Sequence, residues 1–428
     1  MKSRTCRGAR GFTLVELMVA SSLSLIVLAA ALWSAAELQR RGTFEESLME
    51  AQNTLRAVRE LLVVELQRAG MGMGSASMVF GKNDKNLGND LRYAIIVSPE
   101  ERFDGNGLFP KDDAFKAPAA GELYSDRVSD ALQVWGWDSG AVDPVDNAIG
   151  MIPLSLCTQA PNAADLFRTG NDLCTRNLTA DIKDRLVMVV KPESRTACIM
   201  RVTEVIQVPG APYARITVVP GYTENQPALT GPCTTLAAGA PPADRSYWGS
   251  DKTGSFLLLM RGTAFRVNWA SGVPVLERRE ISSDTKLANP GWVALSQDVE
   301  MIRLRLGVMK DLTSATSDVL WFPDKTQVPV HPAIDKCTDA QCTPLVPGGW
   351  VVSPNLPTAR DALMSRVRMV QVDVITRTAR KDTSLVREST PGKYLPDADG
   401  NPQDGFKRRS TTLEIMPRNF SYAGVLAP

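Results

Sequence analysis

The first seventy residues carry two hydrophobic patterns, and both predict helix. From Leu17 to Ala36, twenty consecutive residues have no charged side chain. Farther along, apolar residues recur at helical spacings and form one face, at Leu48, Leu55, Val58, Leu62, Leu66 and Ala69. No proline occurs before Pro99, and residues 70, 72 and 74 are all glycine. We therefore predict one helix from Phe12 to about Ala69, within a helical segment 12–72.

After Gly74 the pattern changes to short runs of apolar residues separated by Gly, Pro, Asn and Asp. Residues 300–306 and 366–374 alternate between polar and apolar, which is typical of an antiparallel sheet with one solvent-exposed face. The predicted strands are Leu132–Trp137, Leu186–Val190, Cys198–Val208, Arg215–Val219, Phe256–Trp269, Val299–Met309, Val367–Arg377 and Thr411–Ile415. The sequence thus predicts an α+β fold, in which a long N-terminal helix packs on a mostly antiparallel sheet with large insertions.

Composition and motifs argue against most chemistry. The 48 basic and 47 acidic residues leave a net charge of +1, so no nucleic-acid partner is expected. His331 is the only histidine, which weakens mechanisms that need a His pair or a multi-His metal site. No P-loop, GxSxG or HExxH motif is present. We therefore predict no catalytic residues, no cofactor and no metal site.

The uncharged run is long enough to cross a membrane. Twenty helical residues rise about 30 Å, the thickness of the hydrocarbon core. Four basic residues precede the run and no acid occurs before Glu16, so the positive-inside rule places everything after Ala36 outside the cytoplasm. No small-residue cleavage site follows Ala36. Any cut must therefore fall before the run, or there is none. Glu16 stands at the edge of the run, where an unpaired carboxylate would be costly in lipid.

The segment Gly11-Phe12-Thr13-Leu14-Val15-Glu16-Leu17 resembles the cleavage site of type IV prepilins and pseudopilins. The resemblance implies that a prepilin peptidase removes the basic leader 1–11 after Gly11 and that Phe12 becomes N-methylated. It also implies that segment 12–36 anchors the subunit in the inner membrane and later packs in the filament core. Glu16 is then the fifth mature residue, paired in assembly with the Phe12 ammonium of its own chain or a neighbour's.

Residues 73–428 would form an extracytoplasmic β-rich head, with a Pro/Gly/Ala stretch indicating two lobes divided near 236–250. Three head segments resemble minor pilins of the PilW type: Leu295–Glu300, Arg366–Val372, and Lys407–Thr412 with Arg418-Asn419. This resemblance implies a minor pilin in the tip or priming complex of a type IV pilus, supporting adhesion or twitching motility. Its implied partners are other minor pilins, the major pilin and, as a further candidate, a large tip adhesin of the PilY type. The alternative is a pseudopilin of a type II secretion or DNA-uptake system.

Removing the leader leaves six cysteines in an oxidising compartment, where pairing is expected. Loop closure favours neighbours, so we predict Cys337–Cys342, Cys157–Cys174 and Cys198–Cys233. For Cys337–Cys342 a metal knuckle is the weaker alternative. The loop Asp397–Asp404 fits a solvated turn, or a calcium loop that lacks the distal glutamate of an EF-hand.

Overall fold

A computed structural model describes most of the helix and sheet positions of the chain. The described residues are 13–71, 78–79, 91–100, 114–119, 123–137, 151–154, 172–176, 182–191, 196–207, 213–220, 255–281, 291–310, 318–346, 358–391 and 393–420. The chain divides into two compact units. Unit 1 contains residues up to Gln52 together with Thr378–Lys407, and unit 2 contains Asn53–Arg377 and the residues from Arg408 onward.

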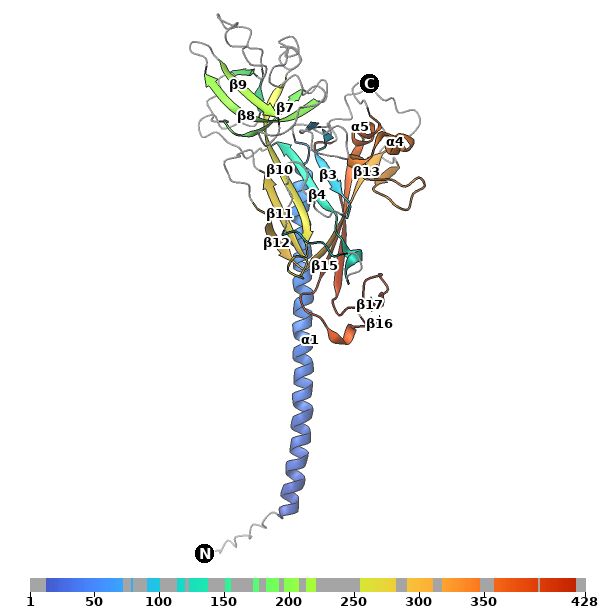
Figure 1. The fold of residues 1–428 in the computed structure, drawn as a ribbon. Coiled ribbons are helices and arrows are strands. Elements are labelled where there is room, and N and C mark those ends of the chain that lie inside the picture. Colours follow the sequence, from blue (N-terminus) through green and yellow to red (C-terminus); the bar gives the residue numbers. More distant parts are fainter. Residues whose placement is uncertain are drawn as a thin grey trace, which may run out of the picture. The chain divides into compact units, whose positions relative to one another are not determined.

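The predicted N-terminal helix is present as α1, Leu14–Arg68. It runs without a break (Figure 1), as expected of a stretch with no proline. Gly70 follows its last turn with a positive φ of 70°, a conformation that glycine adopts without strain, so the predicted stop is confirmed.

The strands of unit 2 form two sheets among the described residues. The larger sheet has the order β12-β11-β10-β7-β8-β1-β2, with further strands beside β10, β8 and β4. Its strands are β1 Met78–Val79, β2 Leu91–Arg92, β3 Ile95–Ser98, β4 Ala131–Trp137, β5 Met151–Pro153, β6 Asp172–Arg176, β7 Leu186–Lys191, β8 Thr196–Gln207, β9 Tyr213–Pro220, β10 Phe256–Asn268, β11 Val275–Ile281 and β12 Val293–Gln297. Strand β10 joins its two parts, because its first half pairs with β7 and its second half with β4 and β11.

The smaller sheet has the order β14-β13-β15-β18, and all of its pairings are antiparallel. Its strands are β13 Val299–Met309, β14 Val319–Phe322, β15 Val367–Arg377 and β18 Arg408–Ile415. Two short helices accompany it, α4 Asp339–Cys342 and α5 Ala359–Met364. Unit 1 holds a separate two-stranded sheet of β16 Glu388–Thr390 and β17 Lys393–Tyr394.

The last part of α1 packs in a core that both sheets of unit 2 share. Val58, Leu62 and Leu66 are buried with residues of β4, β10, β13 and β15, so the predicted apolar face is confirmed there. A close approach between strands completes this core: a Cβ at Gly262 would lie 2.1 Å from the ring of Trp135, so only glycine fits. A second cluster gathers residues of β7, β8, β9 and the start of β10.

All eight predicted strands are present, and the α+β class is confirmed. The prediction missed β11, whose sequence Val275–Ile281 contains four consecutive charged residues and does not show an apolar alternation. It also missed β12 and β14, which are only five and four residues long. The predicted lobe boundary near 236–250 lies outside the described residues.

Candidate functional site

The candidate site is the N-terminal part of α1, and its geometry starts with a helix cap. The backbone N–H and the hydroxyl of Thr13 both donate to Glu16 Oε2, each at 3.0 Å. In return, the N–H of Glu16 donates to Thr13 Oγ1 at 3.3 Å. This reciprocal pair is a capping box, which satisfies backbone donors that the helix itself leaves open. Gly11 and Phe12, the predicted processing residues, lie outside the described residues.

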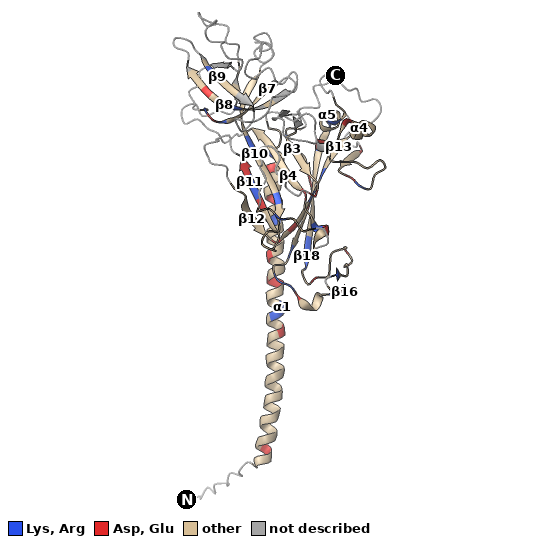
Figure 2. Cartoon of the chain, in the orientation of Figure 1, with Lys and Arg blue, Asp and Glu red and all other residues tan. Residues whose placement is uncertain are grey.

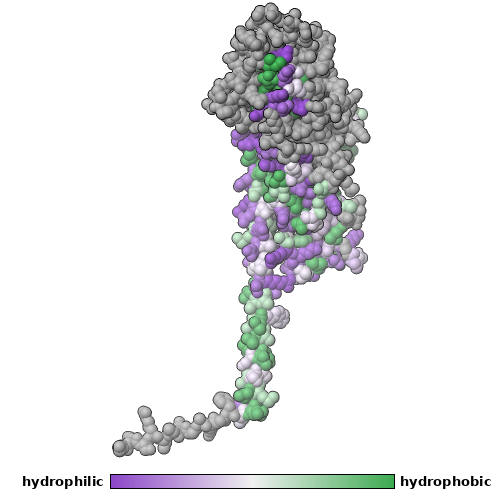
Figure 3. Space-filling model, turned by 60° about the vertical axis from the view of Figure 1, so that its left-hand side comes forward, coloured by the Kyte–Doolittle hydropathy of each residue, from purple (hydrophilic) through white to green (hydrophobic). Residues whose placement is uncertain are grey.

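The helix after this cap is apolar and unburied. Every residue from Thr13 to Ala36 is exposed, including large side chains such as Leu28 and Trp33. Figure 2 shows this part of α1 without charge apart from an acid near its start, and Figure 3 shows its surface as hydrophobic. Within the described residues, α1 is the one helix long and apolar enough to cross a membrane.

Three of the serines inside the apolar run form hydrogen bonds to the helix itself. Three serine hydroxyls donate to backbone carbonyls three or four residues earlier, at 2.8–3.0 Å, from Ser21, Ser22 and Ser24. A polar group that keeps its hydrogen bond costs much less in an apolar environment than one that loses it. The run therefore suits lipid or a packed helical core, and the charged Glu16 stands directly before it.

Ionic contacts begin directly after the run, at Glu37. Arg41 Nε lies 3.1 Å from Glu37 Oε1 on the same helix. Arg40 Nη2 lies 2.5 Å from Asp382 Oδ1 in the other segment of unit 1. The sequence analysis did not predict the capping role of Thr13 or the ion pair between Arg40 and Asp382. The T-x-x-E spacing of Thr13 and Glu16 could have revealed the cap, whereas no local signal marks Arg40 and Asp382 as partners.

Cysteine pairing is described in part. Cys337 and Cys342 form a disulfide, which closes the turn that holds α4, and both residues are buried. Cys198 on β8 is buried and also disulfide-bonded. Cys174 lies in β6, and Cys157 and Cys233 lie outside the described residues. The pairings Cys157–Cys174 and Cys198–Cys233 stay predictions.

The other candidate sites take part in local structure. The Asp397 carboxylate accepts the N–H groups of Asp399 and Asn401, at 2.9 and 2.7 Å, which is a side-chain-capped turn. His331 stacks on Phe322 and bonds the carbonyl of Trp321 through Nδ1 at 2.9 Å. Within the described part of the chain, no three His, Cys, Asp or Glu side chains gather as metal ligands would.

Comparison with known proteins bears mainly on this N-terminal segment. The family model of the prokaryotic N-terminal methylation motif matches residues 6–32. No curated protein matches the chain. Among solved structures, a type IV-like pilin from Thermus thermophilus is similar at 10% identity and a TM-score of 0.28, over 86% of this chain and 96% of that chain.

The motif and the geometry agree on one segment. Residues 6–32 contain the second half of the basic leader, the predicted processing residues, the capped Glu16 and most of the exposed apolar run. The chain therefore carries the class III signal, with its methylation motif and apolar helix, of a type IV pilin-like protein.

Proposed function

We propose that this chain is a minor pilin of a type IV pilus, acting in the tip or priming complex that initiates assembly. In this role it supports surface adhesion or twitching motility and has no enzymatic activity. The observation that carries the proposal is the exposed apolar helix Leu14–Ala36, most of which lies within the matched methylation motif. Such a surface needs lipid first and other pilin helices afterwards.

The proposed path has two stages. A prepilin peptidase cuts after Gly11 and the new N-terminal Phe12 is methylated, so the apolar helix stays in the mature subunit. That helix holds the subunit in the inner membrane, with the head outside the cytoplasm. During assembly it leaves the lipid and packs against the same segment of the major pilin and other minor pilins.

Glu16 would fix the register of that packing. Its carboxylate is exposed in the isolated chain and reaches only Thr13 among the described residues. In a filament core it needs a positive partner, and the Phe12 ammonium of a neighbouring subunit supplies one. A buried ion pair adds little net stability, but a wrong register leaves a charge unpaired, which is expensive.

A pseudopilin of a type II secretion or DNA-uptake system would need the same N-terminal segment. The head of about 350 residues and its PilW-like segments favour the pilus. At the pilus tip, this chain would bind a large adhesin of the PilY type.

Mass spectrometry of sheared, purified pili tests the proposal. We expect this chain in the pilus fraction at far lower abundance than the major pilin, co-purifying with other minor pilins and starting at N-methyl-phenylalanine 12. An intact Met1 start in assembled material would contradict the processing. Absence from pili, together with co-purification with a secretion or DNA-uptake complex, would favour the pseudopilin.

A further inference from the structure

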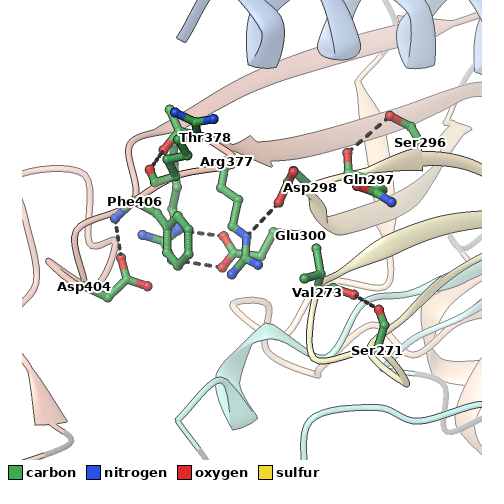
Figure 4. Close-up of polar contacts among 12 residues, drawn as sticks. Ser271, Val273, Ser296, Gln297, Asp298, Glu300, Arg377, Thr378, Asp404 and Phe406 are labelled. Carbon is green, nitrogen blue, oxygen red and sulfur yellow. Dashed lines mark hydrogen bonds and ion pairs between the residues drawn. The ribbon is translucent and has the colours of Figure 1, made fainter. Parts of the chain in front are cut away.

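The smaller sheet of unit 2 contains a long insertion between β15 and β18. Residues 378–407 leave β15 after Arg377 and return at Arg408, two residues that lie directly opposite each other in the ladder. Both are held by carboxylates near the start of β13: Arg377 Nε lies 3.3 Å from Asp298 Oδ1, and Arg408 donates to Glu300 at 2.6 and 2.9 Å. Figure 4 shows Arg377 pointing toward Asp298. Arg377 and Arg408, the residues on either side of the insertion, are therefore both held within the smaller sheet.

The insertion is itself ordered by hydrogen bonds within unit 1. Its first and last residues are joined from Thr378 N to Lys407 O at 2.9 Å. Farther in, Asp382 N donates to Gly405 O at 2.8 Å, and Arg387 N donates to Gln403 O at 2.9 Å. These bonds hold segment 380–387 against residues 403–405 of the insertion.

Two contacts attach the insertion to α1, and both lie within unit 1. The Arg40–Asp382 ion pair is the first. The second is Lys407, whose Nζ lies 4.8 Å from the centre of the Phe44 ring. Hydrogen bonds from Ser384 and the Arg40 guanidinium lower the pKa of Asp382, so its carboxylate is ionised at neutral pH. The Ser384 bonds, at 2.7 and 3.0 Å, also orient that carboxylate.

The attachment point has a defined height above the membrane. When Leu17–Ala36 fills the hydrocarbon core, Arg40 stands four residues, or about 6 Å, above its edge. Each headgroup layer adds about 5–7 Å beyond the hydrocarbon. Asp382, held by Arg40, therefore lies at headgroup level while α1 is in the membrane.

The side chains around this point suit a headgroup layer. The turn that follows Asp382 ends at Leu385, which is 36% exposed. Arg380, Lys381 and Arg387 are exposed on either side of that turn. Basic side chains with an apolar residue between them can bind lipid phosphates while the apolar group reaches the acyl boundary. Asp382, the acid among these residues, is already paired with Arg40.

We propose that segment 380–387 docks on phospholipid headgroups of the outer surface of the membrane that holds α1, before the subunit enters a filament. This inference rests on the membrane anchoring in the proposed function. The ion pair with Arg40 sets the depth of the segment. The docking surface consists of Arg380, Lys381, Leu385 and Arg387.

A photo-crosslinker in place of Leu385 tests the docking directly. The full chain carrying a benzophenone amino acid at Leu385 is reconstituted into vesicles of phosphatidylethanolamine and phosphatidylglycerol, irradiated, and examined by mass spectrometry. Arg40→Gln and Arg41→Gln are matched variants in that background. Both remove one positive charge from the same helical turn, but only Arg40 contacts Asp382, since Arg41 pairs with Glu37.

We expect a lipid adduct in the parent and in Arg41→Gln, and loss of the adduct in Arg40→Gln. A parent that resists alkaline extraction yet forms no lipid adduct would overturn the docking and leave the anchoring intact. An adduct to a second copy of the chain would assign segment 380–387 to a subunit contact instead. A parent released by alkaline extraction would contradict the anchoring itself. An adduct of equal yield in Arg40→Gln would show that this ion pair does not set the depth.

Discussion

Glu16 would take part in two interactions, which two different substitutions can separate. In the isolated chain its carboxylate caps the first turn of α1 through Thr13. In the proposed filament it neutralises the Phe12 ammonium of a neighbour. A glutamine at position 16 keeps an acceptor for the capping box but has no charge, whereas a valine loses both.

We predict that Glu16→Gln and Glu16→Val both insert in the membrane and both fail to enter pili. Breaking a buried ion pair costs about 3–5 kcal/mol, so incorporation should fall by about two orders of magnitude or more. Immunoblots of membrane and sheared-pilus fractions measure the two steps separately. If Glu16→Gln reached pili at the wild-type level while Glu16→Val did not, the capping box alone would explain the glutamate.

At the scale of elements, the pair Glu300–Arg408 joins two strands that are not neighbours. Strands β13 and β18 flank β15, and Glu300 stands at an irregularity in the β13–β15 register, between Val299 and Met301. Its side chain is 0% exposed and that of Arg408 3%. The doubly hydrogen-bonded contact therefore holds this end of the sheet together without help from solvent.

We predict that Glu300→Gln destabilises the head by about 3–5 kcal/mol, because it removes the charge of the buried carboxylate to which the Arg408 guanidinium donates. Lys310→Gln is the control, since it removes the surface pair with Asp318, whose side chain is 79% exposed. That change should cost less than about 1 kcal/mol. Urea unfolding of the full chain in detergent, monitored by tryptophan fluorescence, gives the change in unfolding free energy for both variants. Equal effects would mean that the buried pair contributes no more than a surface pair.

Attachment of the insertion to α1 should depend on pH. The pKa of Asp382 is lowered in the folded chain, first by its hydrogen bonds from Ser384 and then by Arg40. A depressed carboxyl pKa means that this contribution is complete above the unfolded value and is lost as pH falls through the folded value. We therefore predict that hydrogen-exchange protection of residues 380–387 persists at neutral pH and decreases below about pH 4.

In that experiment Asp382→Asn should lack the added protection at every pH. Protection that changed equally in the parent and in Asp382→Asn would assign the pH dependence to another group. The rates are compared after correction for intrinsic exchange.

Local pattern predicted the elements well, but it did not predict the contacts between them. The limits of α1, β13 and β15 follow from periodicity and breakers within a few residues of each end. The Arg40–Asp382 and Glu300–Arg408 pairs join residues 342 and 108 positions apart. Nothing local distinguishes these charges from solvated ones. The alternation in β13 places Glu300 on the same face as the apolar Ile302 and Leu304, but it does not show which cation a neighbouring strand supplies to that face.

For the whole molecule, the proposed export of the head bears on its stability. A head in an oxidising compartment benefits from cross-links that restrict its unfolded chain. The Cys337–Cys342 disulfide closes only a short loop around α4, so it shapes a local surface more than it stabilises the head. The predicted disulfides among the four cysteines between β5 and β10 would close longer loops.

We predict that non-reducing peptide mapping of the exported protein finds Cys157–Cys174 and Cys198–Cys233. These loops span 17 and 35 positions (174 − 157 and 233 − 198), and the chain-entropy model assigns each about 3–4 kcal/mol. Cys198 is already buried and disulfide-bonded on β8, so reducing its bridge should loosen the second core cluster of unit 2 before the core around α1. A free thiol at Cys157, or peptides linking Cys174 to Cys198, would contradict the pairing by neighbours. In the second case the bridge would join β6 to β8, two strands that flank β9, and would stabilise that sheet rather than the connections around it.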